Sequence, residues 1–176
     1  MIAVRFQHPT PYFDDSYAVN SESNGPYGDA ILKELIPYIE EHFRIIREAY
    51  ARVLTGGSTG GWESIALQVY HPEFFGGTWT FYPDPVDFSN FQLMDIYRDD
   101  NAFYEPGHEW LKPERYMMRK ADGQPEVTVA QMSRLEAVLG SHGRSGQQMD
   151  AFWSVVRPCG QRRLPPKALG LSYRHY

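Results

Sequence analysis

Residues 2–6 alternate between apolar and polar side chains, which predicts a short strand near the beginning of the chain. Residues 7–28 are interrupted by prolines and glycines and predict a long loop. Apolar residues then recur at helical spacing from Asp29, a suitable N-cap, to about Phe43, which predicts a helix. Pro37 lies inside this helix and should kink it, because its ring removes one backbone donor.

The next segments alternate between strand and helix. Residues 50–54 predict a strand that ends at a glycine pair, and residues 59–70 have the apolar spacing of a helix, which His71 and Pro72 end. Residues 78–82 predict another strand. The order strand, helix, strand, helix, strand favours a mostly parallel sheet with flanking helices, which is the α/β class.

The pattern changes at Pro83. The following residues up to about position 127 are aromatic and proline-interrupted without a clean period, which indicates an irregular, cap-like segment over one sheet edge. A helix is expected over residues 128–139, and glycines end it. We therefore expect three parts: a core over residues 1–82, a cap-like insertion with a helix over 83–150, and an atypical basic tail over 151–176.

Composition narrows the possible classes of protein. The chain has 176 residues, 42% hydrophobic and 15% aromatic, as in globular domains. Its net charge of −5 gives no reason to expect a nucleic-acid partner, and no apolar run is long enough to span a membrane. Cys159 is the only cysteine, which excludes an internal disulfide and a cysteine zinc site. We expect no cofactor and no metal ion, and the compartment stays open.

The main candidate catalytic residues lie in one stretch, RVLTGGSTGGWES, residues 52–64. Gly56, Gly57, Ser58, Thr59 and Gly60 fit the motif G-x-S-x-G at a predicted strand-to-helix turn, where a serine takes strained backbone angles and presents its hydroxyl above the sheet. The glycines two positions before and after the serine are expected where strand and helix nearly touch. The backbone N–H of Thr59 would help to stabilise an oxyanion.

Three other interpretations of this stretch are weaker. A phosphate-binding Walker loop needs a lysine, and none occurs between Arg44 and Lys112. A dinucleotide-binding loop needs glycine where Ser58 stands. A flexible linker is unexpected between a strand and an amphipathic helix. A plain tight turn stays open beside the nucleophile elbow.

Together, SYAVNSESNGPYGDAILKELIPYIEEHFR and ARVLTGGSTGGWESIALQVYHPEFFGG resemble the putative esterase (esterase D-like) family of the α/β-hydrolases over about residues 12–82. The resemblance implies an α/β-hydrolase fold with Ser58 as the nucleophile and the Thr59 N–H in the oxyanion hole. One departure is Thr55-Gly56-Gly57, where many members have Gly-His/Tyr before the serine.

The partners of the serine are harder to find. In this fold the acid and the histidine follow the serine along the chain. Asp84 and Asp87 are candidate acids, and His108 and His142 are candidate bases, but none of them lies in a recognisable family context. Exposed loop positions explain the histidines better, and a solvated acidic surface or contacts within the cap explain the aspartates better. His108 is not part of a zinc-protease helix, because Lys112 stands where the second histidine would be.

We therefore expect a partial hydrolase that lacks early strands and the late acid and histidine. Five basic residues and no acidic residue follow Asp150, so residues 1–150 carry a net charge of −10. An out-of-frame C-terminus would explain this abrupt change in composition. Exposed sheet edges would then favour self-association.

The expected function is a serine carboxylic-ester hydrolase that works through an acyl-enzyme and is impaired in this chain. The alternatives are a non-catalytic, truncated hydrolase fold that binds a ligand, and a peptidase on the same scaffold. A small-molecule or carbohydrate-linked ester is the expected substrate. Aromatic residues are candidates to line its site, although packing explains them better: Tyr12, Tyr17, Trp79, Phe81, Tyr82 and Trp110.

Overall fold

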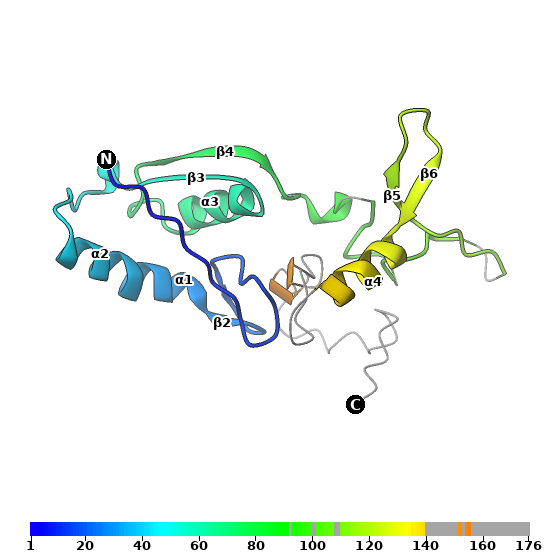
Figure 1. Cartoon of the computed structure of the whole chain (residues 1–176), viewed down its shortest axis with the longest axis horizontal. Helices are drawn as coiled ribbons and strands as arrows, with labels where there is room; N and C mark the ends of the chain where they lie inside the picture. Colours follow the sequence, from blue (N-terminus) through cyan, green and yellow to red (C-terminus); the bar gives the residue numbers. More distant parts are fainter. Residues whose placement is uncertain (92, 100, 108–109, 140–150, 153, 156–176) are drawn as a thin grey trace.

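The computed structural model describes residues 1–91, 93–99, 101–107, 110–139, 151–152 and 154–155. The chain combines helices with small parallel and antiparallel sheets, an arrangement compatible with the α/β class (Figure 1). Strands β3 (Val53–Ser58) and β4 (Gly77–Pro83) are parallel neighbours, joined through helix α3 (Thr59–Tyr70). This β3-α3-β4 unit has the strand-helix-strand order expected from the pattern. In the described part of the chain, no helix is long and apolar enough to cross a membrane.

Helix α3 packs along one face of the β3–β4 pair (Figure 1). Its bounds agree with the predicted helix, because both ends of the segment are clear in the sequence. The buried face differs from the predicted apolar stripe, since Glu63 and Ser64 are buried and Val69 is exposed. Strand β3 begins three residues later than predicted and continues through the glycine pair to Ser58. A 3₁₀ turn, η2 (Ala49–Ala51), occupies the beginning of the predicted strand.

The predicted strand at residues 2–6 is wrong. In the structure this segment has no strand assignment, because no neighbouring strand pairs with it. It instead runs as an extended chain past α3 and the first helical region (Figure 1). A two-residue ladder between β1 (Asn20–Ser21) and β2 (Gly25–Pro26) lies within the predicted loop.

The first helical region begins at α1 (Tyr27–Ala30), two residues before the expected N-cap. It continues through a π-helical stretch, η1 (Ile31–Leu35), into α2 (Ile36–His42). Pro37 therefore lies in the first turn of α2, directly after the π-helical stretch. Because helical residues precede it without a break, Pro37 removes one backbone donor inside a continuous helical region, and the π-helical stretch directly before it is the local irregularity at this point.

The segment after Pro83 has more order than its sequence pattern predicts. A 3₁₀ turn, η3 (Phe88–Asn90), is followed by a hairpin of β5 (Tyr116–Arg119) and β6 (Pro125–Thr128). Sequence reasoning missed this hairpin because each strand has only four residues and neither has a regular alternation of apolar and polar side chains. Helix α4 (Val129–Leu139) then follows within one residue of the predicted helix.

One buried cluster joins the beginning, the middle and the end of the described chain. Tyr17 stacks on Phe152 with ring centroids 4.6 Å apart, and Trp62 meets both rings edge-on. Phe91 and Val129 belong to the same cluster. The first residues of the expected tail are therefore part of the core.

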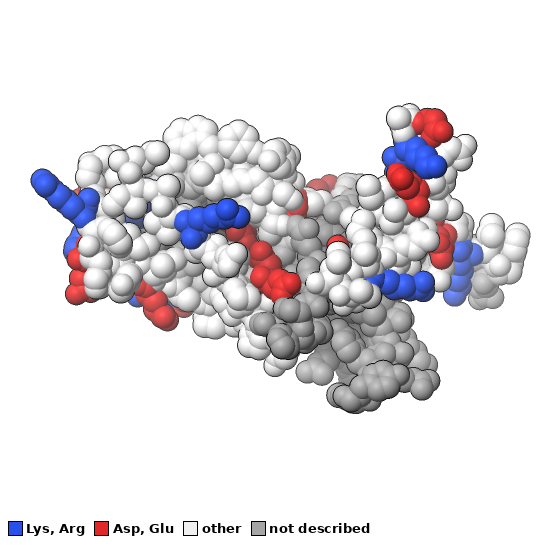
Figure 2. Space-filling view, viewed as in Figure 1, with Lys and Arg blue, Asp and Glu red and all other residues white. Residues whose placement is uncertain are grey.

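The face of β3–β4 opposite α3 is open to solvent. Val53, Trp79 and Phe81 are exposed there, at 46%, 63% and 55%. The surface over these strands is mostly uncharged in the face shown (Figure 2). Self-association through this sheet stays a prediction.

Candidate active site at the β3–α3 turn

Ser58 lies where β3 ends and α3 begins. It has φ 54° and ψ −124°, backbone angles that an L-residue takes only at a cost of about 1–3 kcal/mol. The residue is exposed to solvent. The sharp turn that the sequence motif predicts is therefore present, and its hydroxyl is accessible.

Glycines make this turn possible by allowing backbone segments to approach one another. A Cβ at Gly56 would lie 2.1 Å from the carbonyl oxygen of Gly60. This contact supports the steric expectation for Gly56. The same expectation is wrong for Gly60 itself, because a Cβ there would meet no atom within 4 Å.

Two neighbouring glycines are also close to other groups, Gly57 to a side chain that can move and Gly61 to backbone. A Cβ at Gly57 would lie 2.9 Å from the hydroxyl of Tyr82, so this ring covers the strand side of the turn. A Cβ at Gly61 would lie 2.8 Å from the carbonyl oxygen of Phe81. Gly61 lies outside the G-x-S-x-G pattern, which is why sequence reasoning did not single it out.

Asp84 follows β4 and brings a carboxylate to the serine. The Ser58 hydroxyl donates to Asp84 Oδ1 over 3.3 Å, and the Thr59 hydroxyl donates to Oδ2 over 3.1 Å. The backbone N–H of Asp84 donates to the carbonyl oxygen of Ser58 over 3.3 Å. Parallel pairing of β3 and β4 causes this proximity, because both strands end at the same sheet edge.

Tyr17 holds the same carboxylate from the buried side. Its hydroxyl donates to Asp84 Oδ2 over 3.0 Å, and its side chain is fully buried. Burial, together with the charge of Asp84, raises the pKa of Tyr17 well above its ordinary value. Tyr17 is thus a neutral hydrogen-bond donor. Sequence reasoning proposed it only as a ligand-lining aromatic, since nothing in an irregular loop indicates a partner 67 positions away.

The other candidate acid and both candidate bases are not brought to the serine. Asp87 is exposed and caps η3, with its carboxylate accepting from the backbone N–H of Ser89 over 2.9 Å and the side chain of Asn90 over 2.6 Å. These hydrogen bonds lower the pKa of Asp87. His108 and His142 lie outside the described residues.

A family of known proteins matches most of the chain. The family model described as "Putative esterase" covers residues 7–154, which include β3, α3, β4 and Asp84. The chain belongs to this family. Membership supports a hydrolase with an esterase function in general and a small-molecule substrate. No curated protein matches the chain significantly.

A cavity of about 320 Å³ lies beside α3 in this esterase-family chain. Its lining includes Ala18, Trp62, Leu67 and His71, but not Ser58. The cavity therefore lies beside the core cluster and is separate from the serine.

Proposed function

We propose that this chain is a serine carboxylic-ester hydrolase whose nucleophile is the Ser58 hydroxyl. The observation that carries the proposal is the strained backbone of Ser58 between β3 and α3, combined with its exposed side chain. Strain of this kind persists where the surrounding structure enforces it, and it clusters at reactive sites. Membership of the esterase family supports the same chemistry.

In the proposed reaction, Ser58 Oγ attacks the ester carbonyl carbon and loses its proton to a base. The carbonyl oxygen becomes an oxyanion, and the backbone N–H of Thr59 stabilises it at the positive end of the α3 dipole. The tetrahedral intermediate collapses to an acyl-enzyme and releases the alcohol, which takes up the proton. Water then attacks the acyl carbon, the bond to Ser58 Oγ breaks, and the carboxylic acid leaves while a proton from the water returns to Oγ.

Asp84 orients the serine in this proposal but is a poor substitute for a histidine base. A carboxylate is a much weaker base than an imidazole near neutral pH. The 3.3 Å separation between Ser58 Oγ and Asp84 Oδ1 leaves no room for an imidazole between them. No histidine in the described residues has a hydrogen bond to Ser58, so we expect slow turnover unless His108 or His142 supplies the base.

The substrate side of the proposal rests on exposed aromatic rings of β4, of which Tyr82 lies against Gly57 at the turn and Trp79 lies opposite Thr55. Tyr82 is 79% exposed and Trp79 is 63% exposed on β4, so both are available to an ester or a sugar-linked acyl group. Tyr17 does not belong to this set, because it is buried in the core.

Labelling with a fluorophosphonate tests the nucleophile directly. We expect one adduct on Ser58, located by peptide mass spectrometry, and slow hydrolysis of p-nitrophenyl acetate. Both should vanish in Ser58→Ala and persist in Ser89→Ala, a matched change at an exposed serine. A wild-type chain that takes up no label would contradict the proposal and would favour the alternative, a hydrolase fold that binds a ligand without catalysis. Hydrolysis of a matched anilide at a comparable rate would instead favour a peptidase.

A further inference from the structure

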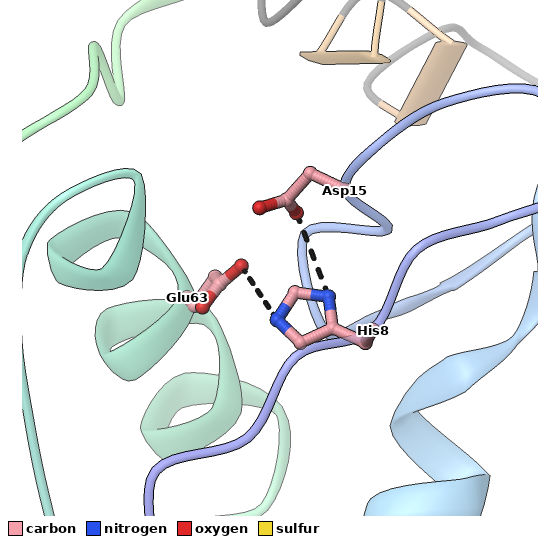
Figure 3. A group of neighbouring side chains, drawn as sticks. All are labelled: His8, Asp15 and Glu63. Atoms are coloured by element: carbon pink, nitrogen blue, oxygen red, sulfur yellow. Dashed lines mark ion pairs between the residues drawn. The ribbon is translucent and has the colours of Figure 1, made fainter. Parts of the chain in front are cut away.

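Three potential metal ligands from separate segments meet behind the β3–α3 turn. His8 lies on the extended N-terminal segment, Asp15 on the loop that follows it, and Glu63 on α3 (Figure 3). The Nε2 atom of His8 is 3.3 Å from Glu63 Oε1, and its Nδ1 atom is 3.6 Å from Asp15 Oδ1. One ligand atom from each residue lies within 4.8 Å of the others, the only such group of three within the described part of the chain.

The cluster has an excess of buried negative charge. The side chains of His8 and Glu63 are only 11% and 12% exposed, and that of Asp15 is 32% exposed. Among the described residues, no lysine or arginine forms an ion pair with either carboxylate. One imidazole therefore faces two carboxyl groups, a combination that is costly without further positive charge.

Glu63 Oε1 is a buried oxygen that points into this cluster. Its neighbour there is His8 Nε2, at 3.3 Å, but this contact lacks hydrogen-bond geometry, and Glu63 is only 9% exposed. A bound cation would coordinate this oxygen and neutralise the carboxylate at the same time.

The distances suit a small divalent ion. Bonds of about 2.0–2.1 Å in a tetrahedral site place neighbouring ligand atoms about 3.3 Å apart. The separation between His8 Nε2 and Glu63 Oε1 has this value. Asp15 Oδ1 accepts from the backbone N–H of Tyr17 over 2.6 Å, while the other carboxylate oxygen of Asp15 is turned to the side of Glu63 (Figure 3).

The second ring nitrogen of His8 is also suitably placed. The Nδ1 atom is 2.8 Å from the hydroxyl of Ser16 and also accepts from the backbone N–H of Ser16 over 3.3 Å. Metal binding through Nε2 uses the tautomer protonated on Nδ1, which donates to this hydroxyl and gives up the longer contact with the N–H. Histidine ligands are typically oriented by a hydrogen bond of this kind. One nitrogen and two carboxylate oxygens are donors that Zn²⁺ and Mn²⁺ accept.

We propose that His8 Nε2 and one carboxylate oxygen each from Asp15 and Glu63 bind a divalent first-row transition-metal ion. Water completes the coordination on the exposed side of Asp15. The ion joins the N-terminal segment and its following loop to α3, close to Tyr17, which holds Asp84. Its role is structural and is independent of whether Ser58 is a nucleophile.

Titration calorimetry of the full chain, freed of metal by chelation, tests this site with ZnCl₂ and MnCl₂. We expect one ion to bind per chain and the midpoint of thermal unfolding to rise. His8→Ala and Glu63→Gln should each weaken binding about 100-fold, at least as much as the loss of an orienting second-shell partner. Asp14→Asn and His42→Ala, which change exposed residues of the same types, should bind as the wild type does.

Absence of binding by the wild-type chain, or equal binding by Glu63→Gln and the wild type, would overturn the proposal and leave only an ion pair. Because His8→Ala removes a buried contact and risks misfolding, a second measurement uses the wild-type chain alone. Substoichiometric Mn²⁺ should broaden the amide NMR signals of His8, Asp15 and Glu63 before that of His42. Broadening confined to other residues would also overturn the proposal.

Discussion

Gly56 and Gly60 lie so close across the β3–α3 turn that a Cβ on Gly56 would be 2.1 Å from the carbonyl oxygen of Gly60. Backbone atoms on both sides fix this contact, so a flexible side chain cannot relieve it. We expect Gly56→Ala to reduce the free energy of unfolding by about 3 kcal/mol or more, as in severe overpacking. Urea denaturation followed by circular dichroism measures the change.

Gly60→Ala is the matched control for this prediction. A Cβ at Gly60 would meet nothing within 4 Å, and its φ is not positive. Alanine is the better helix former by roughly 0.5–1 kcal/mol, so Gly60→Ala should be neutral or slightly stabilising. Equal destabilisation by both substitutions would contradict the prediction, because it would mean that a Cβ at Gly60 clashes as severely as one at Gly56.

The strain at Ser58 gives a second prediction. Glycine takes positive φ without the penalty that alanine shares with serine. Ser58→Gly should therefore be more stable than Ser58→Ala by about 1 kcal/mol, although both remove the hydroxyl. Thermal and urea unfolding of the two variants measure this difference. A less stable glycine variant would indicate a relaxed turn in solution.

The Tyr17 hydroxyl donates a hydrogen bond to Asp84, and removing this hydroxyl measures how much the bond contributes to stability. Tyr17→Phe keeps the buried ring but leaves Asp84 Oδ2 without this donor. Hydrogen bonds to charged groups contribute about 1.5–3 kcal/mol, so we expect a loss of that size in the free energy of unfolding. Tyr82→Phe, which changes a ring that is 79% exposed, should alter it by less than about 0.5 kcal/mol. Equal effects would mean that the Tyr17 hydrogen bond does not matter.

The raised pKa of Tyr17 predicts a pH dependence. Burial and the charge of Asp84 keep the phenol protonated in the folded chain, whereas an unfolded tyrosine ionises near pH 10. The folded state then binds more protons above that pH, so its stability falls as the pH rises. This part of the decrease should be absent in Tyr17→Phe. A wild type and a variant with parallel stability profiles between pH 9 and pH 11 would contradict the assignment.

Local pattern predicts the β3-α3-β4 unit well, but not the rest of the fold. The helix at Thr59–Tyr70 has apolar residues at helical spacing and clear ends, so its bounds follow from the sequence, although Glu63 and Ser64 are buried and Val69 is exposed. The strand at residues 2–6 does not form because alternation supplies an apolar face but no partner strand. The end of β3 was predicted too early, since glycines usually end a strand, whereas here they allow Ser58 to approach the helix.

The part of the site that lies within one motif can be predicted from the sequence. The parts that depend on contacts between segments far apart in the chain cannot. The turn at Ser58 follows from five consecutive residues. The proximity of Asp84 follows from parallel pairing, which the predicted topology implied only in outline. Tyr17 and the cluster of His8, Asp15 and Glu63 depend on how loops cross α3, and no periodicity encodes that path.

Arg115 organises the irregular segment whose pattern was least informative. It is only 2% exposed, and its guanidinium pairs with Asp99 over 2.6 Å and donates to the carbonyl oxygens of Leu93 and, over 2.9 Å, Tyr104. Arg115→Met removes these donors and leaves Asp99 without its buried partner. A loss of about 3–5 kcal/mol is expected, as for other broken buried ion pairs.

The effect of Arg115→Met should also be local. Amide hydrogen exchange should rise most between residues 91 and 119, where the guanidinium joins separate turns, and least in α3. Arg119→Met is the control, because Arg119 is exposed on β5 and should change stability by less than about 0.5 kcal/mol. If the two variants unfold at the same urea concentration, Arg115 does not hold this segment together, and the aromatic packing around Phe91 must do so instead.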